Sequence, residues 1–263
     1  MMLPEDVATS TRQANELSSD QAKPLLIKGV VLAAGRGSRL GDATAQLPKP
    51  LMPVGNRVCI DFAIAALLPL VSEIIVVTGY MAEQVEAHLA KRWRAKPVTT
   101  VRNLALEAGN LTSLHAARAL VADAPFILTN SDHLFPSDMY TTFFPLGKGV
   151  RIACERDRPI QADEMKVLEN SGKLAAISKL LPEYDGAYIG TTAVSQEALG
   201  CYWQAFDAVL ANQDISIASV EMVLGELTRD PQSAPQLCWI DGLQWYEVDT
   251  PEDLAIAREG LEH

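Results

Sequence analysis

The segment with the clearest chemical content is rich in glycine and carries cationic side chains. Residues 32–40 read LAAGRGSRL, and residues 48–51 read PKPL. Glycine and other small residues let the backbone come close to a triphosphate, and successive amide groups can bind its oxygens. Arg39 can hold phosphate with a two-pronged guanidinium group, and Lys49 offers a compact positive charge. The segment therefore predicts a triphosphate-binding loop.

Two well-known phosphate-binding motifs do not match this loop. The P-loop requires the pattern GxxxxGK[ST], and the dinucleotide-binding fingerprint requires GxGxxG. The first pattern is absent, and Gly35 and Gly37 begin the second one, but Leu40 stands where its third glycine would be. We therefore expect a phosphate-binding loop of another type.

Strands and helices alternate through the first half of the chain. Residues 25–32 form an apolar run that stops at the glycine-rich loop, which is typical of a strand buried on both faces of a parallel sheet. The same reasoning predicts strands at 73–78, 98–101 and 125–129 and helices at 61–71, 81–93 and 110–121, the last one capped by Asn110. Such repeats indicate a doubly wound sheet, with ligands outside the carboxyl ends of its strands. We therefore expect the chemistry at residues 33–39, near Thr78, around Gly109 and at Asp132.

The pattern changes after residue 150. Short strands are predicted at 150–154, 165–169 and 174–178, with turn residues between the last two, and further elements are a strand at 185–194, helices at 196–210 and 217–227, a strand at 237–240 and a helix capped by Thr250. The three short strands are expected to pair in an antiparallel manner. The predicted fold class is therefore α/β, a doubly wound Rossmann-like mixed sheet with a small antiparallel β segment in the C-terminal half.

Composition limits the kinds of partner. The 263 residues include 48% apolar side chains, enough for a substantial core, and the formal net charge is −11. This charge repels a phosphate backbone, so we expect no nucleic acid partner. The longest apolar stretches, such as 58–71, are interrupted or shorter than the roughly 20 residues of a membrane-spanning helix, so we expect no membrane partner.

The ends of the chain and its cysteines allow further expectations. Residues 1–24 are polar, lack the features of a secretory signal and are expected to form a flexible extension, while residues 261–263 resemble the start of a tag. The cysteines, which form no CxxC pair, are expected to be reduced and buried, and this indicates a cytoplasmic location. They are Cys59, Cys154, Cys201 and Cys238.

At residues 32–40 and 48–51 the sequence resembles the nucleotidyltransferases that activate sugar and polyol phosphates, whose signature is LAAGxGxRL followed by PKPL. The resemblance extends through residues 107–110, 126–133 and 248–254, so it covers nearly all of the chain after the extension. Within that family the sequence is most similar to the CTP:inositol-1-phosphate cytidylyltransferases, through LTxxDH at residues 128–133 and the compact C-terminal half.

The resemblance implies a fold of the nucleotide-diphospho-sugar transferase type and a catalytic set of Arg39, Lys49, Asp132 and Asp249. Asp132 and Asp249 would hold Mg²⁺, because carboxylate oxygens suit a hard cation that also binds phosphate. His133 is expected to position Asp132 rather than to move a proton, since the attacking phosphate is already ionised. The expected nucleotide-binding residues are Leu32, Ala33, Ala34, Gly35, Gly37, Ser38, Arg39, Thr78, Glu107, Gly109, Asn110 and Ser113.

On the acceptor side, Lys166 and Lys179 resemble the lysines that family members present to the acceptor phosphate. The sequence departs from the family's Glu-Lys-Pro form, because Lys179 lies in Ser-Lys-Leu. Arg156 and Arg158 are further cationic candidates. The implied organisation is one domain over residues 25–260, with a nucleotide-binding half (25–149) and an acceptor-binding half (150–260), acting as a monomer or homodimer.

The expected reaction joins a nucleoside triphosphate, CTP by the closest similarity, to a small phosphorylated acceptor such as inositol 1-phosphate and releases pyrophosphate. Several alternatives stay open. The chain could be a uridylyl- or guanylyltransferase for a sugar 1-phosphate, a cytidylyltransferase for phosphocholine or a phosphonate, or a molybdopterin nucleotidyltransferase. A catalytically silent nucleotide-binding subunit is the alternative from another class.

Overall fold

The structure, a computed structural model, describes residues 26–144 and 146–261. The flexible extension predicted for residues 1–24 and two of the three predicted tag residues, 262 and 263, lie outside the described residues. Leu261 is the last residue of helix α6 (Pro251–Leu261). Within the described ranges, every helix is too short or too polar to span a lipid bilayer.

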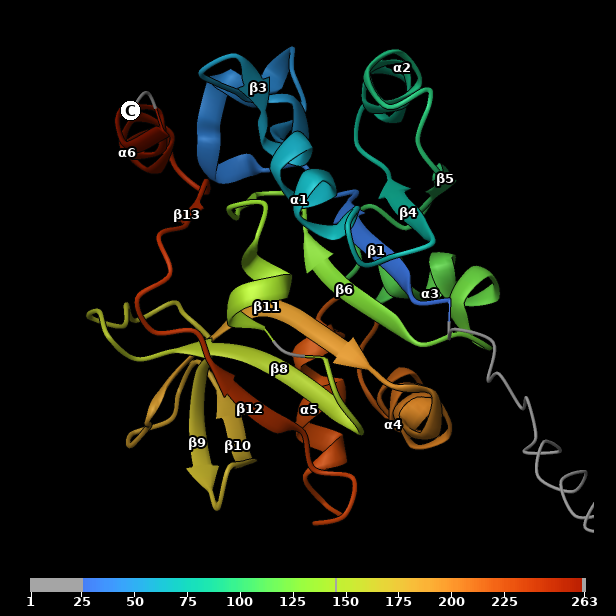
Figure 1. The fold of residues 1–263 in the computed structure, drawn as a ribbon, viewed down its shortest axis with the longest axis vertical. Coiled ribbons are helices and arrows are strands. Elements are labelled where there is room, and N and C mark those ends of the chain that lie inside the picture. The colour runs from blue at the N-terminus through green and yellow to red at the C-terminus, as the bar shows by residue number, and fades with distance from the viewer. Residues whose placement is uncertain (1–25, 145, 262–263) are drawn as a thin grey trace, which may run out of the picture.

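Strands from both halves of the chain join one mixed sheet (Figure 1). Over the described residues this sheet contains, in spatial order, β5 (Val98–Arg102), β4 (Glu73–Thr78), β1 (Lys28–Ala33), β6 (Phe126–Asn130), β11 (Gly186–Val194), β8 (Val150–Glu155), β12 (Gln236–Trp239), β10 (Lys173–Ser178) and β9 (Lys166–Asn170). The first four strands are parallel, and β11 pairs with β6 and β8 in the antiparallel sense. The predicted doubly wound mixed sheet is confirmed.

The C-terminal strands differ in one respect from the prediction. β9 and β10 form the expected antiparallel hairpin, but β8 pairs with β11 and, in the parallel sense, with β12. The antiparallel segment therefore extends the parallel sheet and does not stand apart from it. The prediction missed the β8–β12 pairing because strands far apart in sequence reveal no partner by their composition.

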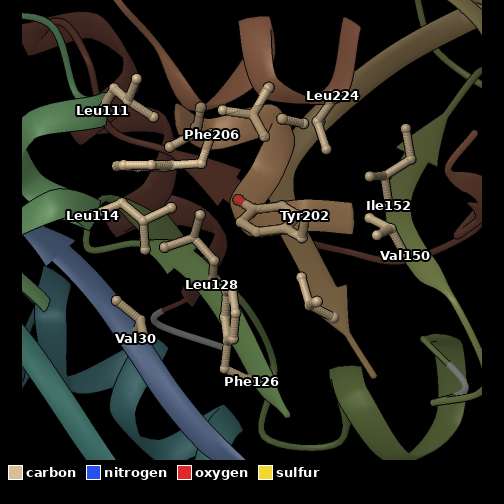
Figure 2. Close-up of a cluster of buried hydrophobic side chains, with 14 of the residues drawn as sticks. Val30, Leu111, Leu114, Phe126, Leu128, Val150, Ile152, Tyr202, Phe206 and Leu224 are labelled. Carbon is tan, nitrogen blue, oxygen red and sulfur yellow. The ribbon is translucent and has the colours of Figure 1, made fainter. Parts of the chain in front are cut away.

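Helices cover both faces of the sheet because successive strand residues point to opposite sides. One face is covered by α3 (Leu111–Val121), α4 (Leu199–Asn212) and α5 (Val220–Leu227). The other face is covered by α1 (Cys59–Leu67), α2 (Ala82–Arg92) and the π-helical turn η3 (Met139–Phe143). Figure 2 shows the first core, in which Phe206 and Tyr202 of α4 pack beside Leu128 and Phe126 of β6.

A third, smaller cluster supports the loops at the carboxyl ends of the strands. It joins the 3₁₀ helix η1 (Ser38–Ala45), the hairpin of β2 (Pro53–Val54) and β3 (Arg57–Val58), and helix α6, which lies beside this hairpin in Figure 1. The short 3₁₀ helix η2 (Lys49–Leu51) leads into the hairpin, and a last 3₁₀ turn, η4 (Gln196–Ala198), precedes α4.

Two very short strands, β7 (His133–Leu134) and β13 (Tyr246–Glu247), decide where the distant aspartates lie. They pair in the antiparallel sense, with Glu247 opposite His133. The amide of Val248 then donates to the carbonyl oxygen of Asp132 at 3.1 Å. This pairing brings Asp249 close to Asp132. Neither strand could be predicted from the sequence, because two residues show no periodicity.

Most predicted elements agree with the structure to within a few residues. β4 has the predicted bounds, and α6 begins after Thr250, whose Oγ1 accepts a hydrogen bond from the amide of Asp253 at 3.2 Å. Asn110 is the residue before α3, as predicted, but its side chain makes no capping hydrogen bond. Asn110 has helical backbone angles, and its Oδ1 accepts a hydrogen bond from the amide of Val220 at 2.9 Å, so its side chain ties two segments together.

Candidate active site

A cavity of about 2060 Å³ opens at the carboxyl ends of β1 and β6 and continues toward β10, α4 and α5. Leu32 and Ala34 line it from the first strand, Asp132 and Asp249 from the segments beside β7 and β13. Cavities that bind a single small molecule commonly have volumes of about 300–1000 Å³. This one has room for two substrates side by side.

The glycine-rich loop forms one wall of the cavity through Gly35, Gly37 and Ser38. Gly37 has a φ of +66°, and a Cβ atom there would lie 2.7 Å from the Cβ atom of Lys49. Glycine is therefore required for both the turn and the close packing of Lys49. Leu40 is buried beneath the loop, which leaves Arg39 on the cavity side.

Lys49 is the buried centre of a cluster of charges. Its ammonium group donates hydrogen bonds to Asp132 and to Oδ1 of Asp249. A guanidinium nitrogen of Arg39 lies 2.7 Å from the other oxygen of Asp249, and a second lies 3.4 Å from Asp163. Burial opposes the charge of Lys49, but the two aspartates outweigh burial and raise its pKa above the ordinary value. Lys49 is therefore a permanent cation.

Three carboxylates meet beside this ammonium group. Asp132, Glu247 and Asp249 each offer an oxygen within 4.8 Å of the others. Burial tends to raise the pKa of such acids. For Asp132 the charges of Lys49 and His133 and the hydrogen bond from Lys49 together outweigh burial and lower the pKa, whereas for Asp249 burial prevails and the pKa is raised. Oδ1 of Asp132 is buried and has no hydrogen-bond partner among the described residues. An all-oxygen set with an unsatisfied buried ligand atom fits Mg²⁺.

Sequence reasoning missed Glu247, although a signal was present. Glu247 lies two residues before Asp249, and residues at this spacing point to the same side of an extended chain. Asn103 was missed as well, although it follows the carboxyl end of β5, where ligand sites are expected. Both residues line the cavity.

His133 is buried behind the carboxylates. Its Nε2 lies 3.4 Å from Oε1 of Glu247 and 3.6 Å from Oδ1 of Asp132. Burial lowers the pKa of His133, but these two carboxylates outweigh it and raise the pKa; in turn His133 lowers the pKa of Glu247 against the effect of burial. This arrangement places the imidazole ring of His133 where it can orient the carboxylates of Glu247 and Asp132.

The side of the cavity near α3 is built from amide and hydroxyl groups. Asn103 donates hydrogen bonds to the hydroxyl groups of Thr112 and Ser113, both at 3.0 Å. The amide of Gly109 donates to the carbonyl oxygen of Ile215 at 2.9 Å. These bonds fix the loop before α3 on both sides. Asn110 and Ser113 line the cavity, as expected for nucleotide-binding residues.

Four of the expected nucleotide-binding residues do not line the cavity. Ala33 points to the opposite face of the sheet, where it joins the core beneath α1. Thr78 is fully buried, and its hydroxyl group donates to Glu86 at 3.0 Å. Glu107 is exposed outside the cavity, and Gly109 is turned toward the segment before α5. The position of Ala33 follows from strand geometry, because successive side chains of a strand point to opposite faces.

The acceptor-side lysines lie in different surroundings. Lys179 lines the cavity, and its ammonium group has no ion-pair partner in the described ranges. Lys166 is buried and does not line the cavity, because its ammonium group donates to the carbonyl oxygens of Ala162 and Lys179 at 3.0 and 2.9 Å. Lys166 therefore stabilises the segment that carries Lys179 and does not itself face the cavity.

The two arginine candidates on this side are already paired with carboxylates. Arg158 lines the cavity and binds Glu155 and Glu164. Arg156 lies outside the cavity lining and binds Asp241 at 3.0 Å. Lys179 is therefore the more available cation among these candidates.

Comparison with known proteins identifies the family of this chain. A family model described as a MobA-like NTP transferase domain matches residues 29–188. A bifunctional IPC transferase and DIPP synthase from Archaeoglobus fulgidus is 32% identical over 90% of this chain and 44% of that protein. A CMP-5'-(3-aminopropyl)phosphonate synthase from Streptomyces rubellomurinus is 33% identical over 86% of this chain and 37% of that protein. The chain spans about half the length, or less, of these curated relatives.

Among solved structures, the inositol-1-phosphate CTP transferase from T. maritima superposes with a TM-score of 0.72. The superposition covers 90% of this chain and 98% of that one at 21% identity, so it establishes the shared fold. The chain that carries this loop, these carboxylates and this mixed sheet therefore matches one family model over residues 29–188. The chain belongs to the MobA-like NTP transferase family, a family of nucleotidyltransferases.

Proposed function

We propose that this chain transfers CMP from CTP to a phosphorylated polyol such as inositol 1-phosphate, with Mg²⁺ as cofactor and release of pyrophosphate. The observation that carries the proposal is the cluster in which Lys49 and Arg39 meet Asp132, Glu247 and Asp249. It lies directly beside the glycine-rich loop, in a cavity large enough for two substrates.

The reaction brings two anions together, so the site must lower their mutual repulsion. An oxygen of the acceptor phosphate forms a bond to the α-phosphorus of CTP, and the bond between that phosphorus and the bridging oxygen to the β-phosphate breaks. Pyrophosphate leaves with the electron pair of that bond. The attacking phosphate is already ionised, so no residue has to remove a proton from it.

Each side chain of the cluster has a distinct part in this proposal. Arg39, which is partly exposed, would bind the leaving pyrophosphate, and Lys49 would bind the α-phosphate. Asp132 and Asp249, with Glu247, would hold Mg²⁺, which supplies further positive charge beside the phosphates when bound. Lys49 would then exchange carboxylate partners for phosphate oxygens.

The names of the relatives support the choice of substrates. The T. maritima protein is called an inositol-1-phosphate CTP transferase, and the A. fulgidus protein is called an IPC transferase. We propose the same division of labour for the two halves of the domain, with residues 25–149 binding CTP and residues 150–260 binding the acceptor. Lys179 is the proposed contact of the acceptor phosphate, with Lys166 supporting its segment. We propose no nucleic acid partner, because the strongly negative net charge of the chain repels a phosphate backbone.

A phosphonate is a second candidate acceptor, because the Streptomyces rubellomurinus relative is named for a CMP-aminopropylphosphonate product. A phosphonate oxygen carries the same charge as a phosphate oxygen and can attack in the same way. The cluster at Lys49 does not distinguish the two acceptors.

The deciding experiment is a matrix of CTP, UTP, GTP and ATP against inositol 1-phosphate, glucose 1-phosphate, phosphocholine, aminopropylphosphonate and molybdopterin. Pyrophosphate release is measured with Mg²⁺ in every cell of the matrix. We expect turnover with CTP and inositol 1-phosphate, and none in an Asp132→Ala variant. Activity with another pair would replace the proposed substrates, and inactivity throughout would favour a silent nucleotide-binding subunit.

A further inference from the structure

We propose that Gly190 is a positioning residue for the metal site, because its missing side chain creates the space in which His133 holds Glu247 and Asp132. This inference rests on the proposed function, which places Mg²⁺ on these carboxylates. It assigns a role to a residue on β11, in the C-terminal half of the chain, whereas the glycine-rich loop lies in the N-terminal half.

Gly190 interrupts the regular geometry of β11. The register between β11 and β8 shifts between Tyr188 and Thr192, and Gly190 has a φ of +72° in that interval. Such an irregularity changes the direction of a strand and often lies near a functional site. Here it lies in the cavity lining, next to the end of β6.

The backbone of Gly190 is in close contact with the imidazole ring of His133. A Cβ atom at residue 190 would lie 2.3 Å from Cε1 of His133, 3.0 Å from Nδ1 of that ring and 2.6 Å from the side-chain Nδ2 of Asn130. These distances are too short for any side chain. A methyl group at residue 190 must therefore displace the ring.

The ring of His133 is enclosed on its other sides as well. Phe135 and Trp245 pack edge to face against it, with ring centroids at 5.6 and 5.3 Å. The remaining side of the ring carries Nε2, which lies 3.4 Å from Glu247 and 3.6 Å from Asp132. Displacement by residue 190 is thus directed toward the carboxylates or twists Nε2 away from them.

The consequence is a change in metal binding without a change in any ligand. Residues that orient metal ligands are commonly worth a 10- to 100-fold change in metal affinity. His133 orients Glu247 and Asp132, and Gly190 determines where His133 lies. We therefore expect Gly190→Ala to weaken metal binding about tenfold or more.

Binding of Mn²⁺ to the full chain, followed by the loss of the free Mn²⁺ signal in electron paramagnetic resonance, tests this inference. The matched control is Gly172→Ala, because Gly172 has a similar φ of +79° but a Cβ atom there would meet no atom of a more distant residue within 4 Å. Both variants carry the same kind of backbone strain, and only Gly190→Ala creates the clash. We expect weaker Mn²⁺ binding in Gly190→Ala and wild-type binding in Gly172→Ala.

A second pair of variants covers the case in which Gly190→Ala does not fold. His133→Gln can place an amide nitrogen about where Nε2 lies, whereas the shorter His133→Asn ends near Nδ1 and leaves Glu247 without its partner. We expect His133→Gln to bind Mn²⁺ more tightly than His133→Asn. If Gly190 acts through His133, adding Gly190→Ala to His133→Asn should cause little further loss.

The outcomes separate this inference from the proposed function. Equal Mn²⁺ affinity of the wild type and Gly190→Ala, or of His133→Gln and His133→Asn, would overturn the role of Gly190 and leave the transferase proposal intact. An absence of Mn²⁺ binding by the wild type would remove the metal site and this inference with it. The substrate matrix would then decide the transferase activity independently.

Discussion

Lys49 and Asp249 are 200 residues apart in the sequence, and yet the ammonium group of Lys49 donates a hydrogen bond to Oδ1 of Asp249. The same ammonium group binds Asp132, so one buried cation balances two carboxylates. Opposite charges at such short range attract strongly where water is largely excluded. Any divalent cation that binds these carboxylates must compete with Lys49.

Lys49→Met should therefore change two measurements in opposite directions. Without the ammonium group, the free chain should bind Mn²⁺ about fivefold or more tightly, because the coupling between the two cations is lost. Pyrophosphate release should fall by a factor of about 100 or more, as expected when a preorganised charge is removed from a phosphoryl-type transition state. Lys91→Met, on the exposed side of α2, is the matched control. Weaker Mn²⁺ binding in Lys49→Met would refute the competition.

Asp132→Ala should reduce pyrophosphate release by several orders of magnitude and leave the fold intact. The carboxylate is the shared partner of Lys49 and of the proposed metal, and its free oxygen is buried. Steady-state pyrophosphate release and thermal unfolding measure the two effects. Asp123→Ala removes an exposed carboxylate and should change neither. Near-normal turnover of Asp132→Ala would exclude Asp132 from the mechanism.

Lys179→Met should raise the KM for the acceptor and leave the KM for CTP unchanged. Lys179 lines the part of the cavity near β10, where we propose that the acceptor binds. Initial rates at varied acceptor and fixed CTP, and the reverse, measure the two constants. Lys148→Met, which also removes an exposed lysine, should leave both constants unchanged. A larger effect on the KM for CTP than on the KM for the acceptor would show that Lys179 does not contact the acceptor as proposed.

Lys166→Met should act on stability. The ammonium group satisfies carbonyl oxygens of Ala162 and Lys179 in a buried position, and its loss leaves these acceptors without partners. Buried polar groups without partners cost about 1–3 kcal/mol, so the free energy of unfolding should fall by that amount. Urea unfolding of the variant and of Lys179→Met gives the comparison. An unchanged unfolding midpoint would show that these carbonyl groups find other partners.

The pH dependence of stability should reflect Glu86. The hydrogen bond from Arg102, with a further one from Thr78, lowers the pKa of Glu86 against the opposing effect of burial. A carboxyl group with a lowered pKa in the folded state stabilises the fold above its unfolded pKa of about 4.3, and this contribution is lost as the pH falls through the folded-state pKa. Glu86→Gln should therefore lower the free energy of unfolding by at most about 1 kcal/mol at pH 7 and have progressively less effect below about pH 4.

The control for this prediction is Glu83→Gln. Glu83 binds the same arginine, but its side chain is 76% exposed, compared with 25% for Glu86. We expect a smaller effect of Glu83→Gln in the same urea titrations. A destabilisation by Glu86→Gln that grows at low pH would contradict the expected direction of the pH dependence.

Much of the fold could be predicted from local patterns. The apolar run of β4 and the glycine-rich end of β1 are visible in the sequence, because a strand buried on both faces must be apolar throughout. The resemblance to nucleotidyltransferases is confirmed by the family match over residues 29–188. Both signals depend on residues that are close together in the chain.

The features that could not be predicted from the sequence depend on pairing between distant segments. β7 and β13 have two residues each, and their pairing determines that Glu247 joins Asp132. Thr78 was expected near the nucleotide because it ends a strand, but its side chain points to Glu86. The direction of a side chain at a strand end depends on the register and on the neighbouring helix, and neither can be read from one sequence.

The small β7–β13 ladder also governs when the protein becomes competent during its synthesis. Asp132 is synthesised long before Glu247 and Asp249, so the three carboxylates can come together only after the C-terminal segment has been made. Closure of this ladder is a long-range contact, which costs chain entropy and forms late. A partly made chain that ends before β13 would therefore lack two of the three carboxylates of the cluster.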